Sequence, residues 1–330
     1  MLPDALLKAF SDRAVLVTGG TGLIGRQVVD LLAATGARVT VASLDDLVVD
    51  QRAQHVRADL TSFETCKELT RGKDFVCHVA GIKGSIEVTR SKPASFFVPL
   101  LMMNTNLLEA CRQNQVPRVV YTSSIGAYPS AEVFVESSDP ALEGPPMDLY
   151  PGWAKRMGEL QIQAYRTQYG LEGFSVVRPC NVYGPGDDFR SEHAMVIPSL
   201  MVRIRRGEDP LVIWGDGSAV RDFAFSRDVA KGVLLALHHG TGPTYVNLGS
   251  GIPHTLRELV ETLQSFIPFR YRFDPTRPTG FPKRVMDIRR AREQLGFEPE
   301  TSLRDGLEQT WRWYLDHHTE VEKRHSYFGS

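Results

Sequence analysis

The stretch Val-Leu-Val-Thr-Gly-Gly-Thr-Gly-Leu-Ile-Gly at residues 15–25 decides the fold of this chain. Its first three residues predict a buried strand, and the apolar spacing of residues 23–35 predicts a helix that ends at Gly36. Glycines at the turn between them let backbone N–H groups approach a pyrophosphate at the positive end of that helix. The stretch therefore predicts the first strand, turn and helix of a dinucleotide-binding unit.

Short β-branched runs and helical patterns alternate through the first half of the chain. Strands are predicted at Val39–Val41, Phe75–Val79, Arg118–Thr122 and Phe174–Arg178, with a long helix over Trp153–Tyr169. Repeated strand–helix–strand units imply parallel strands joined by right-handed crossovers. The predicted fold class is α/β, a doubly wound Rossmann-type parallel sheet with a smaller C-terminal α/β substrate domain.

Beyond Arg178 the chain is punctuated by Gly/Pro loops, which suit a ligand-shaping domain. A helix over Asp228–His239 and a strand over Tyr245–Gly249 are expected to return to the main sheet. We therefore predict an interleaved division. Residues 1–178 and about 222–250 form the Rossmann domain, and residues 179–221 and 251–330 form the substrate domain.

The bulk composition excludes several classes of function. The 38 basic residues nearly balance the 39 acidic ones, so no overall field attracts nucleic acid or an anionic membrane. No apolar run is long enough to span a membrane, and residues 1–10 lack the pattern of a secretory leader. The four cysteines are scattered and predict no metal site. We expect a cytoplasmic protein.

The glycine spacing of residues 18–25 resembles that of the extended short-chain dehydrogenase/reductases. In that fold an acidic residue at the end of the second strand grips the ribose of NAD. Here that strand ends in Ser43, with Asp45 and Asp46 slightly later, and Arg26 or Arg38 could neutralise a 2′-phosphate. The pattern favours NADP as cofactor, with NAD as the alternative.

The resemblance continues through the residues that carry the chemistry. Ser124, in the segment 121–128, takes the place of the family's catalytic serine, and Tyr150 and Lys155 fall where its Tyr–Lys pair is expected. A tyrosine can exchange a hydroxyl proton near neutral pH only if a neighbouring cation lowers its pKa. The resemblance implies that Tyr150 is the proton donor and acceptor, Lys155 its activator, and Ser124 the partner of the substrate oxygen.

One departure concerns the spacing of that pair. Four residues separate Tyr150 from Lys155 where the family has three, and on a helix this offset moves the two side chains to different faces. If Pro151 is the first helical residue, Tyr150 lies outside the helix and can lean back. A π-bulge would have the same effect. In the remaining interpretation Tyr150 is a surface aromatic and the general acid is lost.

The resemblance also assigns binding residues. Those expected at the cofactor are Gly19, Gly22, Leu23, Ile24, Gly25, Ser43, Asp59, Leu60, Val79, Ala80, Gly81, Asn106, Lys155 and Arg178. Those expected at the substrate are Lys83, Ser85, Asn181, Val196, Arg203, Trp214, Arg221 and Arg284. Cations gathered on these loops of a nearly neutral protein favour a diphosphate ligand, because arginine matches phosphate geometry.

Among the extended members, the chain resembles the GDP-fucose synthases, through residues 78–85 and 184–189. Those enzymes use a cysteine and a histidine as epimerisation acid and base, where this chain has Gly126 and Gly186. Since glycine cannot exchange protons, we expect no 3,5-epimerisation. The acid–base pair that dehydratases of the family carry beside the serine is also missing from Ile125-Gly126.

Three hypotheses follow for the function. The leading one is reduction of a 4-keto sugar nucleotide, with a GDP-sugar favoured over a UDP-sugar. The second is NAD-dependent 4-epimerisation of a nucleotide sugar, and the third, prompted by the Tyr–Lys spacing, is a non-catalytic NAD(P)-binding regulatory module. The resemblance further implies a homodimer through the helices near residues 96–113 and 153–169.

Overall fold

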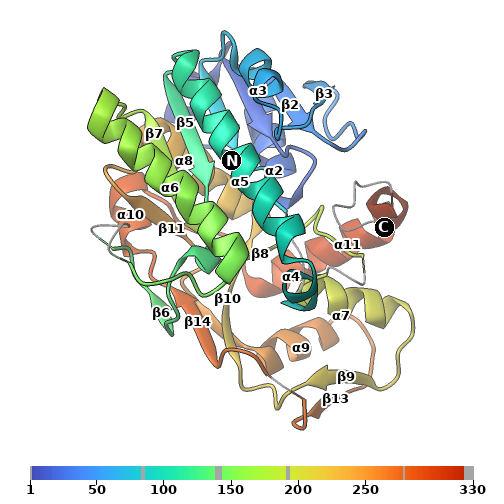
Figure 1. The fold of residues 1–330 in the computed structure, drawn as a ribbon. Helices are drawn as coiled ribbons and strands as arrows, with labels where there is room; N and C mark the ends of the chain where they lie inside the picture. The colour runs from blue at the N-terminus through green and yellow to red at the C-terminus, as the bar shows by residue number, and fades with distance from the viewer. Residues whose placement is uncertain (1, 83–85, 138–142, 191–193, 278, 323–330) are drawn as a thin grey trace.

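A seven-stranded sheet, parallel at every pairing, forms the centre of the larger part of the molecule (Figure 1). The computed structural model describes residues 2–82, 86–137, 143–190, 194–277 and 279–322. The strands of this sheet, in spatial order, are β11 (Tyr245–Leu248), β7 (Phe174–Pro179), β5 (Arg118–Thr122), β4 (Phe75–His78), β1 (Ala14–Thr18), β2 (Arg38–Ser43) and β3 (Gln54–Arg57). This order reverses direction between β1 and β4, which is where doubly wound sheets bind their ligands.

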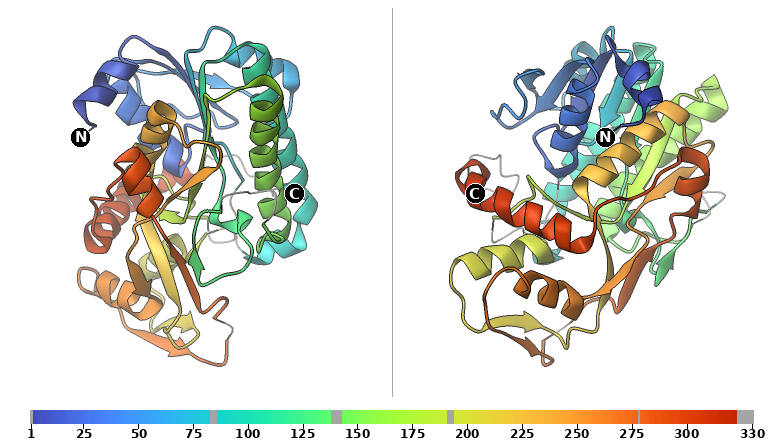
Figure 2. Two further views of the ribbon diagram at one scale, coloured as in Figure 1. Left: turned by 90° about the vertical axis from the view of Figure 1, so that its left-hand side faces the viewer. Right: turned by 180° about the vertical axis from the view of Figure 1, so that it is seen from behind.

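Helices cover both faces of the sheet (Figure 2). One layer consists of α3 (Phe63–Thr70), α5 (Pro93–Gln113) and α6 (Leu149–Tyr169), with α5 packed along α6. The other layer consists of α1 (Asp4–Phe10), α2 (Leu23–Ala33), α8 (Ser226–His239) and α10 (Arg289–Leu295). Because both faces are covered, every residue of β1 and of β7 is buried. The predicted α/β doubly wound fold is confirmed.

The smaller part has its own hydrophobic core. Its elements are α7 (Val196–Arg205), β9 (Leu211–Trp214), α9 (Leu256–Gln264), β13 (Tyr271–Asp274) and α11 (Leu303–Glu322). Residues such as Met201, Leu259 and Leu307 are fully buried among these elements. The strands β9 and β13 pair in parallel at the far end of this part (Figure 1).

A second sheet joins the two parts. Its strands run in the order β12 (Pro253–Thr255), β10 (Val220–Phe225), β14 (Lys283–Met286) and β6 (Val133–Phe134), and β8 (Asn181–Tyr183) also pairs with β10. Two short helices complete the described elements, α4 (Ile86–Ser91) and the 3₁₀ turn η1 (Ile125–Ala127). The chain therefore crosses between the parts several times, as an interleaved division requires.

The division differs from the predicted boundaries in one segment. We expected residues 251–330 to belong to the substrate domain, but Ala291 and Leu295 of α10 are buried in the larger core. The physical reason is packing, because α10 lies against α8 and β11 at the edge of the main sheet. None of the helices in the described ranges is long and apolar enough to cross a bilayer.

Candidate active site

The glycine turn between β1 and α2 leaves room only for backbone. Gly19 has a φ of +66°, and a Cβ there would lie 2.6 Å from the Cα of Ala80. A Cβ on Gly25 would collide with the carbonyl oxygen of Gly19. Gly22 is the N-cap of α2 and offers no side-chain acceptor to the first N–H groups of the helix. This cradle fits a pyrophosphate, because a helix N-terminus without a side-chain cap presents its N–H groups to an anion.

A small pocket at the end of β2 contains the carboxylate of Asp45, which in the sequence comes two residues after the last residue of that strand. Thr21 donates a hydrogen bond from Oγ1 to Oδ2 of Asp45 (2.6 Å), and its Oγ1 also lies 2.8 Å from Oγ of Ser43. All three residues line the pocket, together with Val56 and Arg57. Ser43 is thus where the prediction put it, but it lies beside an acid. A carboxylate here accepts hydrogen bonds from ribose hydroxyls and repels a 2′-phosphate.

The two arginines considered for a 2′-phosphate are engaged elsewhere. Arg26 forms an ion pair with Glu320 of α11 at 2.6 Å and lies over the Trp313 ring at 4.9 Å. Arg38 donates from Nε to the carbonyl of Asp12 on the surface. The C-terminal helix α11 thus reaches the beginning of α2 (Figure 1).

Two further predicted cofactor residues meet across one threonine. Asn106 of α5 donates from Nδ2 to the carbonyl of Thr61 at 2.8 Å. Asp59 accepts from the backbone N–H of the same Thr61 at 2.9 Å. Leu60, which lies between Asp59 and Thr61 in the sequence, is buried. The segment after β3 is therefore tied to α5.

The loop after β4 runs from the glycine turn towards Lys155. Ala80 donates from its backbone N–H to Oγ1 of Thr18, and it faces Gly19. A Cβ on Gly81 would lie 3.7 Å from the Lys155 ammonium nitrogen. Val79, which precedes Ala80, is partly buried against the core. The loop thus lies between the glycine turn and Lys155, and the binding of a cofactor by Val79, Ala80 and Gly81 stays a prediction.

A buried hydrogen-bond chain beneath this loop was missed at the sequence level. His78 contacts Thr18 through Nδ1 (2.8 Å) and Asn104 through Nε2 (3.0 Å), and Asn104 donates to the carbonyl of Ala154. Burial, with the nearby Lys155 charge, lowers the pKa of His78 to about 3, so the imidazole is neutral. This chain of hydrogen bonds links β1, β4, α5 and α6. A histidine inside a buried strand was the only sequence signal for it.

Ser124 and Lys155 lie at the carboxyl end of β5. Ser124 begins the 3₁₀ turn η1, and its Oγ accepts from the backbone N–H of Gly126 at 3.0 Å. Lys155 donates from Nζ to the carbonyl of Thr122 at 2.7 Å. Burial lowers the pKa of the Lys155 ammonium to about 8, against the opposing charge of Glu159. Its pKa therefore lies close to physiological pH, as a proton-transfer site requires.

Tyr150 lies in neither of the two arrangements expected to bring it towards Lys155, a helix start at Pro151 or a π-bulge. The helix α6 begins at Leu149 with Asp148 as its N-cap, so Tyr150 is its second residue and Pro151 its third. The ring is 42% exposed and packs edge-on against Phe97 of α5, with centroids 6.1 Å apart. Five residues along a continuous helix turn by about 500°, which separates Tyr150 from Lys155 by about 140°. The expectation that Pro151 starts the helix and frees Tyr150 is wrong, because the preceding residues are already helical.

Arg178 belongs to a buried ion network with Glu143 and Glu159. Its Nε donates to Glu159 of α6 at 2.8 Å, and its Nη1 donates to Glu143 at 3.0 Å. The guanidinium lies over the Tyr245 ring at 3.6 Å and the Tyr128 ring at 4.3 Å. Arg178 is fully buried, and these contacts use its side chain within the protein. Arg178 therefore has a structural role, and these contacts do not support its predicted role as a cofactor ligand.

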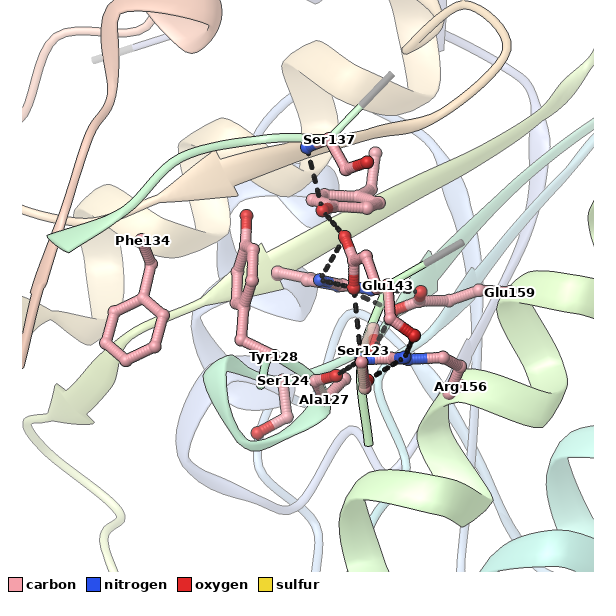
Figure 3. A network of polar contacts seen from close by, with 12 residues as sticks. Ser123, Ser124, Ala127, Tyr128, Phe134, Ser137, Glu143, Arg156 and Glu159 are labelled. Atoms are coloured by element: carbon pink, nitrogen blue, oxygen red, sulfur yellow. Dashed lines mark hydrogen bonds and ion pairs between the residues drawn. The ribbon is translucent and has the colours of Figure 1, made fainter. Parts of the chain in front are cut away.

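The same network anchors the loop that leads into α6. Arg156 pairs with Glu143 at 3.0 Å and donates to the carbonyl of Gly144 at 2.8 Å (Figure 3). Ser123, next to Ser124, donates to Glu159. The beginning of the segment 143–148 is thereby held against β7 and α6. The residues that follow β5, Ser123 and Ser124, are tied to the helix that carries Lys155.

On the substrate side, two arginines form a cationic site. Arg221 of β10 and Arg284 of β14 are adjacent in register, and burial together with the charge of Arg284 lowers the pKa of Arg221 to about 10. Burial also lowers the pKa of Arg284, whose nearest carboxylate partner is Asp148 at 3.8 Å. The Nε of Arg284 is buried without a hydrogen-bond partner in the described part of the chain. Two half-buried guanidiniums with one distant carboxylate fit a diphosphate.

The other predicted substrate residues are scattered. Asn181 donates to the carbonyl of Asp222, and Val196 is the first residue of α7. Trp214 is 56% exposed and lies beside Arg277. Arg203 pairs with Glu208 and donates to the carbonyl of Val212 within the smaller part, so its charge is already balanced. Lys83 and Ser85 lie outside the described residues.

Comparison with known proteins identifies the family of the chain. The model of the NAD dependent epimerase/dehydratase family matches residues 15–249. GDP-L-fucose synthase 1 of Arabidopsis thaliana is 31% identical over 322 residues, which are 94% of this chain and 96% of that protein. The dTDP-4-dehydro-6-deoxy-D-allose reductase of a Streptomyces species is 32% identical over 323 residues, 93% of this chain and 98% of that protein.

Solved structures agree as well. UDP-glucose 4-epimerase of Thermotoga maritima, determined with UDP-glucose, superposes with a TM-score of 0.81 at 29% identity, over 92% of this chain and 99% of that one. The resemblance drawn from the glycine turn and from the segment around Ser124 is thus confirmed over most of the chain. The chain belongs to the NAD dependent epimerase/dehydratase family.

Proposed function

We propose that this protein is an NAD(P)-dependent oxidoreductase that reduces a 4-keto sugar nucleotide, with a GDP-sugar favoured over a UDP-sugar. The observation that carries the proposal is the position of Ser124 and Lys155. They lie at the carboxyl end of β5. The glycine cradle belongs to the main sheet, and Arg221 and Arg284 belong to the second sheet, which joins the two parts. The relatives named for GDP-L-fucose synthesis and for 4-keto sugar reduction support the same chemistry.

Each residue has a role in that reaction. A bound nicotinamide dinucleotide supplies the hydride. Ser124 donates a hydrogen bond to the keto oxygen, and Lys155 stabilises the negative charge that grows on that oxygen. Arg221 and Arg284 hold the diphosphate and so position the sugar. In this proposal Tyr150 delivers the proton after its ring, which packs against Phe97 about 140° around α6 from Lys155, turns towards Ser124.

A 4-epimerase is the second candidate, and the fit to UDP-glucose 4-epimerase favours it. It would use the same residues but keep its cofactor bound from one turnover to the next. The third candidate, a non-catalytic module, is favoured by the position of the Tyr150 ring against Phe97. These alternatives are distinguished by what happens to the cofactor.

We expect the purified protein to consume NADPH or NADH stoichiometrically with GDP-4-keto-6-deoxymannose, giving a product heavier by two hydrogens in mass spectrometry. Ser124→Ala and Tyr150→Phe should each lower kcat by about 10²-fold or more, because each removes a group that acts on the reacting oxygen. An isomer of unchanged mass, formed from UDP-sugars without added cofactor, would identify the epimerase. Tight dinucleotide binding without turnover of any sugar would support the third hypothesis, a non-catalytic regulatory module.

The reaction should slow at alkaline pH because of Lys155. Its pKa is lowered to about 8, so the side chain is a cation below that pH and becomes neutral above it. We expect kcat/KM to fall about tenfold per pH unit above pH ~8, measured at constant ionic strength. Lys155→Arg stays charged through this range and should lose that limb of the profile, whatever its residual rate. A limb that survives in this variant belongs to another group.

Asp45 should set the preference between the two dinucleotides. Because its carboxylate lies beside Ser43, it opposes the 2′-phosphate of NADP. We expect Asp45→Asn to shift the ratio of Kd values towards NADP by about tenfold, or ~1.4 kcal/mol, in fluorescence titrations. Asp46→Asn removes the same charge one residue away and is the matched control. Equal shifts in the two variants would contradict a specific role for Asp45.

We further propose a homodimer through the paired helices α5 and α6. Val98 and Met102 of α5 are 48% and 44% exposed, and Tyr169 of α6 is 47% exposed. These helices lie side by side on one outer face (Figure 1). We expect Met102→Glu to convert a dimer to a monomer in light scattering, while Leu315→Glu on α11, a residue of similar exposure, leaves the dimer intact. A wild-type monomer would refute the proposal.

A further inference from the structure

A carboxylate from outside the catalytic strand lies beside Ser124. A Cβ built on Gly126 would lie 3.0 Å from both Cβ and Cγ of Asp148, and closer still to one of its carboxylate oxygens. Gly126 is also the residue whose N–H donates to Oγ of Ser124. Asp148 therefore occupies the space that a side chain at position 126 would fill, next to the serine.

The backbone around Asp148 is firmly held. Its N–H donates to the carbonyl of Gly126 at 3.3 Å, and the preceding Met147 donates to the carbonyl of Tyr128 at 2.7 Å. Gly152 in the first turn of α6 donates back to the carbonyl of Asp148 at 2.6 Å. A Cβ on Gly152 would collide with the carbonyl of Gly126, so the helix start and the 3₁₀ turn are in direct backbone contact.

The carboxylate itself is reachable by a ligand. The Asp148 side chain is 42% exposed, and Arg284 of the proposed diphosphate site lies 3.8 Å from it. A sugar held between Arg284 and Ser124 therefore passes this carboxylate. Because Asp148 is neither in the segment 121–128 nor at the Tyr–Lys pair, nothing in the sequence pattern pointed to it.

We propose that Asp148 is a proton-transfer residue that acts on a carbon next to the keto group of the bound sugar. This inference rests on the proposed function, because it requires a keto sugar as ligand. A hydrogen on a carbon next to a carbonyl is acidic when the carbonyl oxygen is stabilised, and carboxylates are established bases for its removal. Ser124 and Lys155 supply that stabilisation from one side, and Asp148 supplies the base.

The step is a reversible enolisation. Asp148 takes the proton, the electron pair of the C–H bond forms the C=C bond, and the carbonyl oxygen becomes an enolate oxygen that accepts from Ser124. The protonated Asp148 exchanges its proton with water, and the return of a proton to carbon restores the ketone. A single carboxylate returns the proton to the face from which it was taken. The outcome is exchange of hydrogen with solvent and retention of configuration.

The test is deuterium uptake from D₂O by GDP-4-keto-6-deoxymannose, without NADPH or NADH, followed by mass spectrometry and proton NMR. We expect the wild-type protein to incorporate deuterium beside the keto group, at a rate well above that of a sample without enzyme, with unchanged configuration at that carbon. Reduction is measured separately with added NADPH. Reduction without any exchange would overturn this inference and leave the proposed function standing. Absence of both activities would overturn the proposed function.

Two variants distinguish proton transfer from support of the fold. In Asp148→Asn the ratio of exchange rate to reduction rate should fall about 10²-fold, the usual contribution of a general base. Gly126→Ala keeps the carboxylate but displaces it from Ser124, and the same ratio should fall there too. Asp209→Asn removes an exposed carboxylate paired with Arg270 far from Ser124 and should keep the wild-type ratio. A ratio unchanged in both Asp148→Asn and Gly126→Ala, in proteins with wild-type Tm, would overturn the assignment.

Discussion

The arrangement of the catalytic centre depends on the buried pairing of Arg178 with Glu159 and Glu143. The three side chains come from β7, from α6 and from the loop before α6, and all are almost fully buried. Removing two carboxylates and a guanidinium from water is costly, and only close pairing with additional hydrogen bonds compensates. Leaving one partner unpaired would cost about 3–5 kcal/mol, so these elements cannot separate without a large penalty.

That constraint explains how the catalytic residues are placed. Ser123 shares Glu159 with Arg178, so the end of β5 and the middle of α6 are tied together. Ser124 is the residue after Ser123, and Lys155 lies one helical turn before Glu159 in α6. Arg156 joins Glu143 to the same helix and brings the loop before α6 against η1, which sets Asp148 over Gly126. The network thus positions the proposed catalytic groups Ser124 and Lys155.

Charge in this protein is local. The chain has a formal net charge of −1, yet Arg221 and Arg284 lie half-buried with the carboxylate of Asp148 at 3.8 Å from one of them. Burial and mutual repulsion lower the pKa of Arg221, which means that an arriving anion relieves an unfavourable arrangement. At the end of β2 in the main sheet, an acid that comes two residues after the strand in the sequence lies beside Ser43. The Asp45 carboxylate accepts hydrogen bonds from the hydroxyls of Thr21 and Ser43.

Much of the site was readable from local sequence. The glycine turn requires backbone approach at Gly19 and Gly25, and that requirement is written in consecutive residues. Ser124 and Lys155 were predicted as catalytic residues from the resemblance of the segment 121–128 and of the Tyr–Lys pair to the extended short-chain dehydrogenase/reductases. By contrast, the parts of Arg178 and Arg203 were misjudged because the carboxylates that bind them, Glu159 and Glu208, are identified only by their spatial contacts.

The sequence by itself therefore determined the doubly wound sheet, the dinucleotide turn and the family, because strand and helix periodicity and glycine spacing are properties of neighbouring residues. Only the tertiary structure decided which charges remain for a ligand. The helix start at Leu149, the Tyr150 ring on Phe97 and the Asp148 carboxylate over Gly126 all depend on packing between α5, α6 and η1. Such contacts join residues distant in the chain, and no local pattern encodes the distance between them.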